Sequence, residues 1–496
     1  MTRSHFYAVR LFAFILSTTL IFAGFASAQV ALTQLSQDTF TDPASQHQSE
    51  VEPGAYSWGS TIVTGFQVAR IYGGGGADIG FATSTDGGAT WVNGYLPGLT
   101  IYEGNGLSEA ASDAAVAYDA LHNVWLISVL PIGNTNTSVA VSRSTDGINW
   151  SDPIAVTNLG SPDKNWIVCD NTATSKYYGH CYSEWDDTDQ GDLIEMSTST
   201  DGGMTWSQET PTLGRDYGIG GVPVVKPNGT VIVPINGFDD DVIAFTSTNG
   251  GKTWSRAVEV ASQTSHYESA DLRSGGLISS AIDGKGTVYV AWSDCRYRTN
   301  CAENDIVYST SGSGKKWTAV QRVPIDATTS TVDHFITGMV IDRATSAKKA
   351  HIALAYYTYA NSNCSLSSCQ LYAGFIQSTT AGKTWAAPVT LAGPMSVTWL
   401  PNTFSGYMVA DYISVGFANG KAFPIFAVAQ ANAGTVLNEA IYTTTMGQEA
   451  SEAEQEFLTA EGDVPVPNAH SDHGPREYLD QDNQKPVSGK HPPERD

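Results

Sequence analysis

Acidic side chains that could exchange protons with a bound ligand occur at intervals along this 496-residue chain. Asp113 and Asp333 are candidates for general acid–base groups, because a carboxyl group can donate or accept a proton at a reacting bond. Arginines near them are candidates to bind a carboxylate, since a guanidinium holds two oxygens at once. The best of these candidates are Arg215, Arg273 and Arg296.

Two further residues, Arg70 and His334, complete the candidate binding set. Such charged groups have two interpretations. They are either buried ion pairs that fill a channel, because a buried charge needs a partner, or groups that bind a polar ligand. Lys164, beside Asp163, belongs to the same set.

A short repeated segment, here called the box, determines which elements carry these residues. Ser84–Trp91 reads STDGGATW and recurs as Ser199–Trp206 and Ser247–Trp254. Weaker copies run from Ser144 to Trp150, Ser309 to Trp317 and Ser378 to Trp385. We expect each box to be a tight turn, with Gly supplying positive φ, the acidic side chain accepting backbone N–H bonds, and Trp anchoring the turn. The structural positions are Asp86, Trp91, Asp146, Trp150, Asp201, Trp206, Asn249, Trp254, Trp317 and Trp385. A repeated Asp is better explained as scaffold than as a catalytic acid.

Three predicted strands precede each box, and one follows it. The ranges are 114–119, 124–130 and 138–143; 221–226, 231–236 and 242–246; 277–283, 288–293 and 305–309. A four-stranded unit repeated around a ring is a β-propeller blade. We count seven units, with six as the alternative, and their first strands lie near Ala55, Ala115, Trp166, Gly221, Leu277, Thr337 and Met408. The last unit, with strands at 409–416, 422–430 and 439–444, lacks a fourth strand, so residues 30–38 are expected to close the ring.

In this architecture the boxes lie at one end of the ring, here the box end. The loops that enter the first strands, and those between second and third strands, lie at the other end, here the loop face. The candidate residues fall on the loop face, which is where a ligand would bind.

The ends of the chain differ in composition from the propeller. Residues 1–28 have a basic start, an apolar middle and Ala26-Ser27-Ala28, which is typical of a secretory signal peptide; a membrane anchor is the alternative. Residues 29–447 form the propeller domain, and 448–496 form an acidic, Pro-containing tail expected to be largely disordered. We therefore expect a secreted, periplasmic or extracellular protein with no membrane span.

Six cysteines support that location, because oxidising compartments permit disulfides. Proximity predicts three short-loop pairs, and C-x-x-C spacing typical of metal sites is absent. The pairs are Cys169 with Cys181, Cys295 with Cys301, and Cys364 with Cys369.

Composition excludes some partners. The net charge is −24, so duplex nucleic acid would be repelled. No cofactor is expected. Asp186–Asp189 and Asp239–Asp241 are rich enough in oxygen for Ca²⁺ but lack the spacing of a calcium loop, and exposed turns explain them better. We expect a monomer.

The S-x-D-x-G-x-T-W boxes resemble the Asp-box (BNR) repeats of the sialidase superfamily, over about 29–447. The resemblance implies a sialidase-like propeller that binds a glycan or glycoconjugate, with a Tyr nucleophile paired with a Glu as an exception to the two-carboxylate scheme. By strand register, Tyr407 is the candidate nucleophile and Glu52 its base. The F-R-I-P segment of many sialidases is absent, and Glu50-Val-Glu-Pro53 stands in its place. Two hypotheses follow: a glycoside hydrolase acting at the loop face, and a non-catalytic propeller that binds an extracellular glycan or protein.

Overall fold

The computed structural model describes residues 30–133, 138–274, 276–449 and 465. The expected signal peptide and nearly all of the expected tail lie outside these residues. Among the described residues, the structure has no helix with the length and apolar character needed to cross a bilayer.

Hydrogen bonds join the strands into five propeller sheets and one small extra sheet. The largest contains twelve strands: β1 (Leu32–Gln34), β2 (Ser45–Trp58), β3 (Thr61–Ile71), β4 (Gly76–Ser84), β5 (Val92–Tyr95), β6 (Ala110–Asp119), β7 (Val124–Ile132), β8 (Val139–Ser144), β9 (Ile154–Thr157), β28 (Ser414–Ala418), β29 (Lys421–Ala429) and β30 (Glu439–Thr444). Most neighbouring strands in it are antiparallel.

The other four propeller sheets each have three or four antiparallel strands. They are β10 (Pro162–Cys169), β11 (Cys181–Asp187) and β12 (Leu193–Ser199); β13 (Val224–Val225), β14 (Val231–Asn236), β15 (Asp241–Ser247) and β16 (Val258–Ser262); β18 (Ser279–Ile282), β19 (Val288–Asp294), β20 (Asp305–Ser311) and β21 (Gln321–Arg322); β22 (Asp333–Ile341), β23 (Ile352–Tyr359), β24 (Gln370–Ser378) and β25 (Val389–Ser396).

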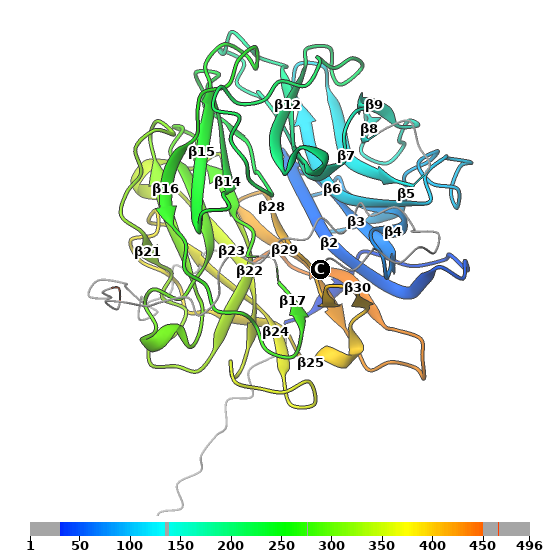
Figure 1. Ribbon diagram of the computed structural model, residues 1–496, viewed down its shortest axis with the longest axis vertical. Helices are drawn as coiled ribbons and strands as arrows, with labels where there is room; N and C mark the ends of the chain where they lie inside the picture. The colour runs from blue at the N-terminus through cyan, green and yellow to red at the C-terminus, as the bar shows by residue number, and fades with distance from the viewer. Residues whose placement is uncertain (1–29, 134–137, 275, 450–464, 466–496) are drawn as a thin grey trace, which may run out of the picture.

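The small sheet holds β17 (Leu272–Arg273) parallel to β27 (Gly406–Met408), with β26 (Asn402–Thr403) antiparallel to β27. Four 3₁₀ turns lie at Thr188–Gln190, Thr299–Cys301, Ala347–Lys349 and Val397–Trp399. Figure 1 shows the sheets arranged around the middle of the molecule, where β28 lies between β14 and β22 on one side and β6 on the other.

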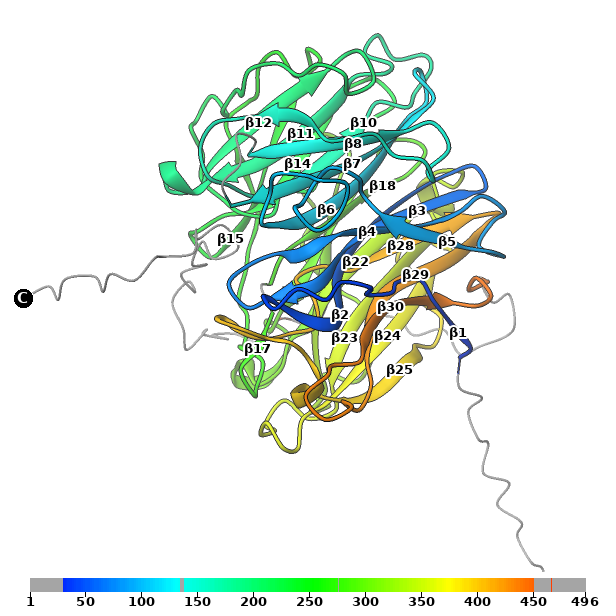
Figure 2. The same cartoon turned by 90° about the vertical axis from the view of Figure 1, so that its right-hand side faces the viewer.

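The expected all-β propeller is confirmed, but seven separate sheets are not found. Strands expected in three units are bonded into the twelve-stranded sheet, because Ser49 pairs with Glu439 and Gly76 pairs with Ala111 across the junctions. β1 pairs antiparallel with β30, Leu32 opposite Thr444, and the two lie side by side in Figure 2. The apolar core lies between the sheets, in several clusters of buried residues.

The boxes form the expected turns. Asp86 accepts N–H and hydroxyl bonds from Thr90 (2.9 and 2.6 Å), and Ser84 accepts the N–H of Gly88 (2.8 Å). These bonds to its carboxylate lower the pKa of Asp86 to about 2. Trp254 and Trp385 are buried, whereas the other box tryptophans are half-buried at the sheet edges. The box of β20 is a correction: its Ser is Ser311, two residues later than expected, because Ser311 receives the N–H of Gly314 (2.8 Å).

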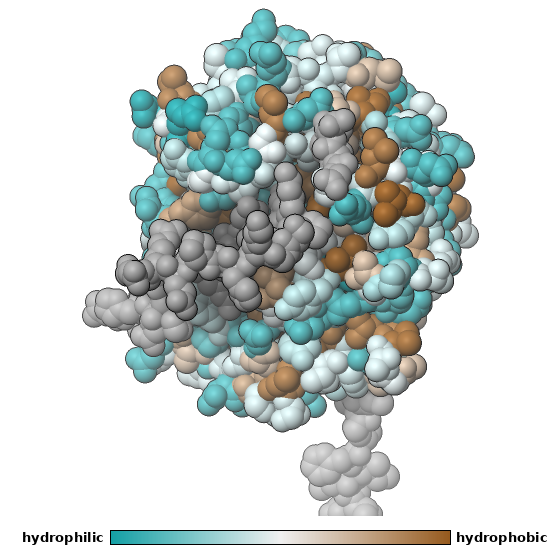
Figure 3. Space-filling view, turned by 45° about the vertical axis from the view of Figure 1, so that its right-hand side comes forward, coloured by the Kyte–Doolittle hydropathy of each residue, from teal (hydrophilic) through white to brown (hydrophobic). Residues whose placement is uncertain are grey.

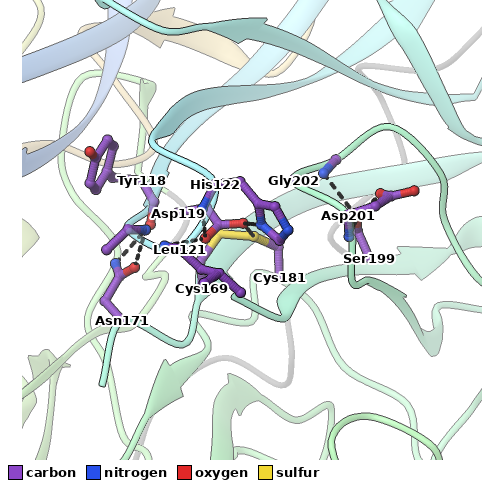
Figure 4. Close-up of a disulfide and its surroundings, with 12 residues drawn as sticks. Tyr118, Asp119, Leu121, His122, Cys169, Asn171, Cys181, Ser199, Asp201 and Gly202 are labelled. Atoms are coloured by element: carbon purple, nitrogen blue, oxygen red, sulfur yellow. Dashed lines mark hydrogen bonds and ion pairs between the residues drawn. A yellow bond between two sulfur atoms is a disulfide. The ribbon is translucent and has the colours of Figure 1, made fainter. Parts of the chain in front are cut away.

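All three cysteine pairings are confirmed. Cys169 and Cys181 join the end of β10 to the start of β11, as Figure 4 shows. Beside them Asp119 accepts the N–H groups of Leu121 (2.9 Å) and His122 (3.2 Å), and its other oxygen contacts the His122 ring (2.6 Å). This disulfide therefore stabilises turns at the box end and is remote from the loop-face candidates.

Candidate active site on the loop face

Bulges in the first strands aim side chains at the loop face. The pairing register shifts at the same place in β2, β6, β10 and β22. At each shift one residue has positive φ: Glu52 (56°), Asp113 (52°), Lys164 (47°) and Ile336 (48°). A bulge turns a side chain out of its normal alternation, and bulges are common beside active sites. Three of the four re-aimed residues are charged.

Lys164 lies at the centre of the resulting cluster. Its ammonium nitrogen is 2.8 Å from Asp411, 3.4 Å from Asp113 and 3.6 Å from Glu52. All four side chains are almost fully buried. The ring of Tyr412 lies below the ammonium, with 6.0 Å to its centroid, and burial with the nearby Glu52 carboxylate raises the pKa of Tyr412. Burial of several charges is tolerable only when they are paired. Here three carboxylates share Lys164, and one of them, Asp411, also binds Arg273.

Two of the predicted arginines join this cluster. Arg273, on β17, donates to both oxygens of Asp411, with Nε to Oδ1 at 2.8 Å. Arg70, on β3, is fully buried and donates to the carbonyl of Gly75 (2.6 Å) and to Gln67 (3.3 Å). Gln67 in turn donates to Glu52. The guanidinium groups therefore position carboxylates and the backbone, and both are already engaged.

A second cluster surrounds Asp333 at the start of β22. Asp333 accepts the backbone N–H of Asn304 (2.7 Å), and its other oxygen is 3.2 Å from Nε2 of His266. The side-chain amide of Asn304 donates to Glu268 (3.2 Å), which also accepts the hydroxyl of Ser274. Asn304 thus bridges two carboxyl groups, Asp333 and Glu268.

The environment gives these groups unusual proton affinities. Burial, reinforced by the charge of Asp333, raises the pKa of Glu268 to about 7. Burial opposes protonation of His266, but contact with Asp333 outweighs it, so the pKa of His266 is raised. His266 is the more exposed of the pair, with 23% of its side chain accessible against 0% for Asp333. A carboxyl that retains its proton near neutral pH can act as a general acid.

One chain segment connects the two clusters. Residues 263–274 carry His266 and Glu268 at one end and Arg273 at the other, and β17 fixes Arg273 against Met408 of β27. The disulfide Cys295–Cys301 holds the neighbouring loop, whose Glu303 accepts the hydroxyl of Ser362 (3.3 Å). The loop face is therefore built from covalently restrained connections.

Several predicted residues lie outside these clusters. Arg215 donates to Gln190 (3.2 Å), and Arg296 binds both oxygens of Asp294, so the three arginines do not converge on one point. Tyr407 is half-buried and is held through its backbone N–H to Asp271 (2.9 Å). The tyrosine whose pKa the Glu52 carboxylate raises is Tyr412.

His334 lies in a separate buried ionic cluster. Its Nε2 is 3.8 Å from Asp326, and burial lowers the pKa of His334. Asp305, Asp326 and His334 have ligand atoms close enough to hold a metal. However, Arg298 and Arg322 both contact Asp305 (2.5 and 2.8 Å) and Asp326 (2.7 Å each), so two cations already occupy the place of a metal ion. These residues do not fit a metal site.

Sequence reasoning missed Glu268, His266, Asn304 and Tyr412. His266 and Glu268 lie in segment 263–274, which follows neither the strand alternation nor the box, so no periodic signal placed it. The available hint was that Arg273 enters a first strand, with acidic and imidazole side chains a few residues earlier.

Comparisons with known proteins give distant structural likenesses. No family model matches the chain, and no curated protein matches it. Among solved structures, the Hadza microbial sialidase Hz136 is 16% identical with a TM-score of 0.42, over 63% of this chain and 64% of that one. The NanB sialidase of Streptococcus pneumoniae is 15% identical with a TM-score of 0.41, over 83% and 70%. A protein of unknown function from Dyadobacter fermentans is 14% identical with a TM-score of 0.44, over 71% and 98%. The chain thus spans less than two thirds of the Hadza sialidase, and the β-propeller class is established by its own sheets.

Proposed function

We propose that the loop face binds a glycan and hydrolyses a glycosidic bond. The observation that supports this most is the pair of carboxyl groups bridged by Asn304, in which Glu268 holds a proton near neutral pH beside the Asp333 carboxyl group. Glycoside hydrolysis commonly needs one carboxylic acid to protonate the leaving oxygen and a second carboxylate nearby. Glu268 is the proton donor in this proposal. Burial, reinforced by the negative charge of Asp333, keeps Glu268 protonated, and His266 lies at the exposed side of the pair.

The charges favour a neutral glycan over sialic acid. Arg273 and Lys164 already contact Asp411, and Arg296 already binds Asp294. A substrate carboxylate would have to compete with Asp411 and Asp294 for these cations, and the −24 charge of the chain would repel it. The sialic acid substrate implied by the family resemblance is therefore the less favoured form of this proposal.

A panel of fluorogenic glycosides, neutral hexosides, N-acetylhexosaminides and a sialoside, tests the proposal. Glu268→Gln should lower turnover of the cleaved glycoside by about 10²–10⁴-fold, because it removes the acid. Turnover by the native chain should fall as pH rises above about 7. Glu259→Gln is the matched control, since Glu259 is exposed on β16. Equal turnover in Glu268→Gln and native protein would refute the role of Glu268.

A non-catalytic glycan-binding propeller is the second candidate. What favours it is that both cations of the Lys164 cluster, Lys164 and Arg273, already bind its carboxylates, as in a structural plug. Binding on a glycan array with no turnover of any glycoside would support this candidate and overturn the hydrolase proposal.

We also infer that seven units surround the site, with β1 as the fourth strand of the last. Only one residue pair joins the strands at each of the two junctions of the twelve-stranded sheet, whereas neighbouring strands of one blade pair along most of their length. This difference supports the count of seven. An experimental structure with five or six units around the axis would contradict it.

A further inference from the structure

The propeller encloses a large cavity along its axis. The cavity has a volume of about 1000 Å³ and is lined by β2, β6, β10, β13, β18, β22 and β28. Apolar side chains dominate its wall, among them Val116, Ile167, Val224, Ile278, Met339 and Ile413. This size and lining are typical of sites for small ligands.

The loop-face end of the cavity is closed by aromatic and apolar packing. The rings of Trp166 and Tyr412 meet edge to face with 5.3 Å between centroids, and Leu277 packs in the same cluster. Lys164 lines the cavity here, and its ammonium is held by carboxylates. The cavity, called the channel below, is thus separate from the Glu268 and Asp333 pair.

The box end carries polar groups that suit an anion. Arg343 donates from Nη1 to the hydroxyl oxygen of Tyr56 (3.1 Å), and Asn171 donates to the same oxygen (3.3 Å). A phenol that accepts two such bonds still has its own proton to donate. Among the described residues, no carboxylate forms an ion pair with Arg343, although the charge of Arg343 acts on the nearby Asp170 carboxyl group, which accepts bonds from Ser175 and Thr172. Trp58, 36% exposed, lies at the rim.

Acidic residues of this rim are already engaged in turns. Asp283 accepts the N–H groups of Lys285 and Thr287 (2.9 Å each) and of Ala347 (2.8 Å). Asp342 accepts the N–H of Ala344 (3.0 Å). Arg343 is therefore the cationic side chain at the box-end opening of the cavity, and the apolar wall extends from there into the cavity. On the face seen in Figure 3, by contrast, hydrophobic residues form small groups among hydrophilic ones.

We propose that this channel binds an unbranched anionic amphiphile of the fatty-acid class. Its carboxylate lies against Arg343 and the Tyr56 hydroxyl, and its alkyl chain extends along the apolar wall towards Tyr412. Burial of each methylene group contributes about 0.8 kcal/mol, so the chain supplies affinity and Arg343 selects the charge of the head group. The acidic residues 450–496 are a poorer occupant, because they contain no long apolar run to fill the channel.

Displacement of a fluorescent fatty-acid probe from the full chain tests this proposal, with dodecanoate, dodecanol and dodecyltrimethylammonium as competitors. Dodecanoate should compete best. Arg343→Gln should weaken the binding of dodecanoate at least tenfold and leave the binding of dodecanol nearly unchanged. Arg256→Gln, at an exposed arginine, should change neither.

A second variant separates loss of binding from loss of fold. Thr337→Phe places a ring in the channel and leaves Arg343 intact, so it should weaken the binding of dodecanoate and of dodecanol by the same factor. Circular dichroism and the melting temperature report whether each variant folds. Equal binding of the three competitors, or unchanged dodecanoate binding in folded Arg343→Gln, would overturn the proposal. Dodecanoate binding only after deletion of residues 450–496 would also overturn it, because the tail would then be the occupant.

Discussion

Replacement of Lys164 by Met should destabilise the propeller, because it removes the cation that three buried carboxylates share, although Asp411 keeps Arg273 as a partner. The ammonium lies 2.8–3.6 Å from Asp411, Asp113 and Glu52, and only 6% of the Lys164 side chain is exposed. Removing one partner of a buried ion pair costs about 3–5 kcal/mol. The unfolding entropy of roughly 400 ordered residues is about 0.8 kcal/mol per kelvin. The melting temperature should therefore fall by about 4–6 °C.

Differential scanning calorimetry at pH 7 measures this change. Lys315→Met is the matched control, since Lys315 is exposed and should shift the melting temperature by less than about 1 °C. An unchanged melting temperature in Lys164→Met would refute the assignment of Lys164 as the shared cation.

Three further changes test other parts of the fold. Burial raises the pKa of Glu50 from 4.5 to about 8, so the free energy of unfolding should fall by up to about 5 kcal/mol as pH rises from 4.5 to 8. Urea titrations should show this fall in the native chain and not in Glu50→Gln. A flat profile in the native chain would contradict the prediction. Trp254→Ala should cost about 3–5 kcal/mol in unfolding free energy because this box Trp is buried, and a cost below 1 kcal/mol would show that the box turn does not depend on its anchor. Replacing Cys169 and Cys181 together by Ala should cost about 3 kcal/mol through loss of a short closed loop, with calorimetry as the measurement and an unchanged melting temperature as the contrary result.

Some strand positions were predictable from the sequence. Val231–Asn236 and Glu439–Thr444 match β14 and β30 residue for residue. First strands were predicted less well: 221–226 is only the two-residue β13, and 409–416 is shifted relative to β28. These strands line the channel and several carry bulges, so tertiary contacts override the alternation.

The candidate site was predictable in part. Asp113, Asp333 and Arg273 do lie in clusters, because strand ends at one face of a propeller converge. Distances were not predictable, since a bulge with positive φ re-aims a side chain without a signal in the sequence. Arg215 and Arg296 bind Gln190 and Asp294, whereas Arg273 binds Asp411, and these partners were not predicted from the sequence.

The bulges and the ion cluster depend on each other. Glu52, Asp113 and Lys164 each have a positive φ, a conformation that costs about 1–3 kcal/mol for a residue other than Gly. Such strain persists only when the surroundings compensate for it, and here the three strained residues are the ones whose charges meet. If the pairing holds the bulges in place, Lys164→Gly should relieve local strain and still destabilise the chain through the lost charge. Lys164→Gly should then melt between the native chain and Lys164→Met, because Met keeps the strain that Gly relieves. A Lys164→Gly variant at least as stable as the native chain would show that strain outweighs the pairing.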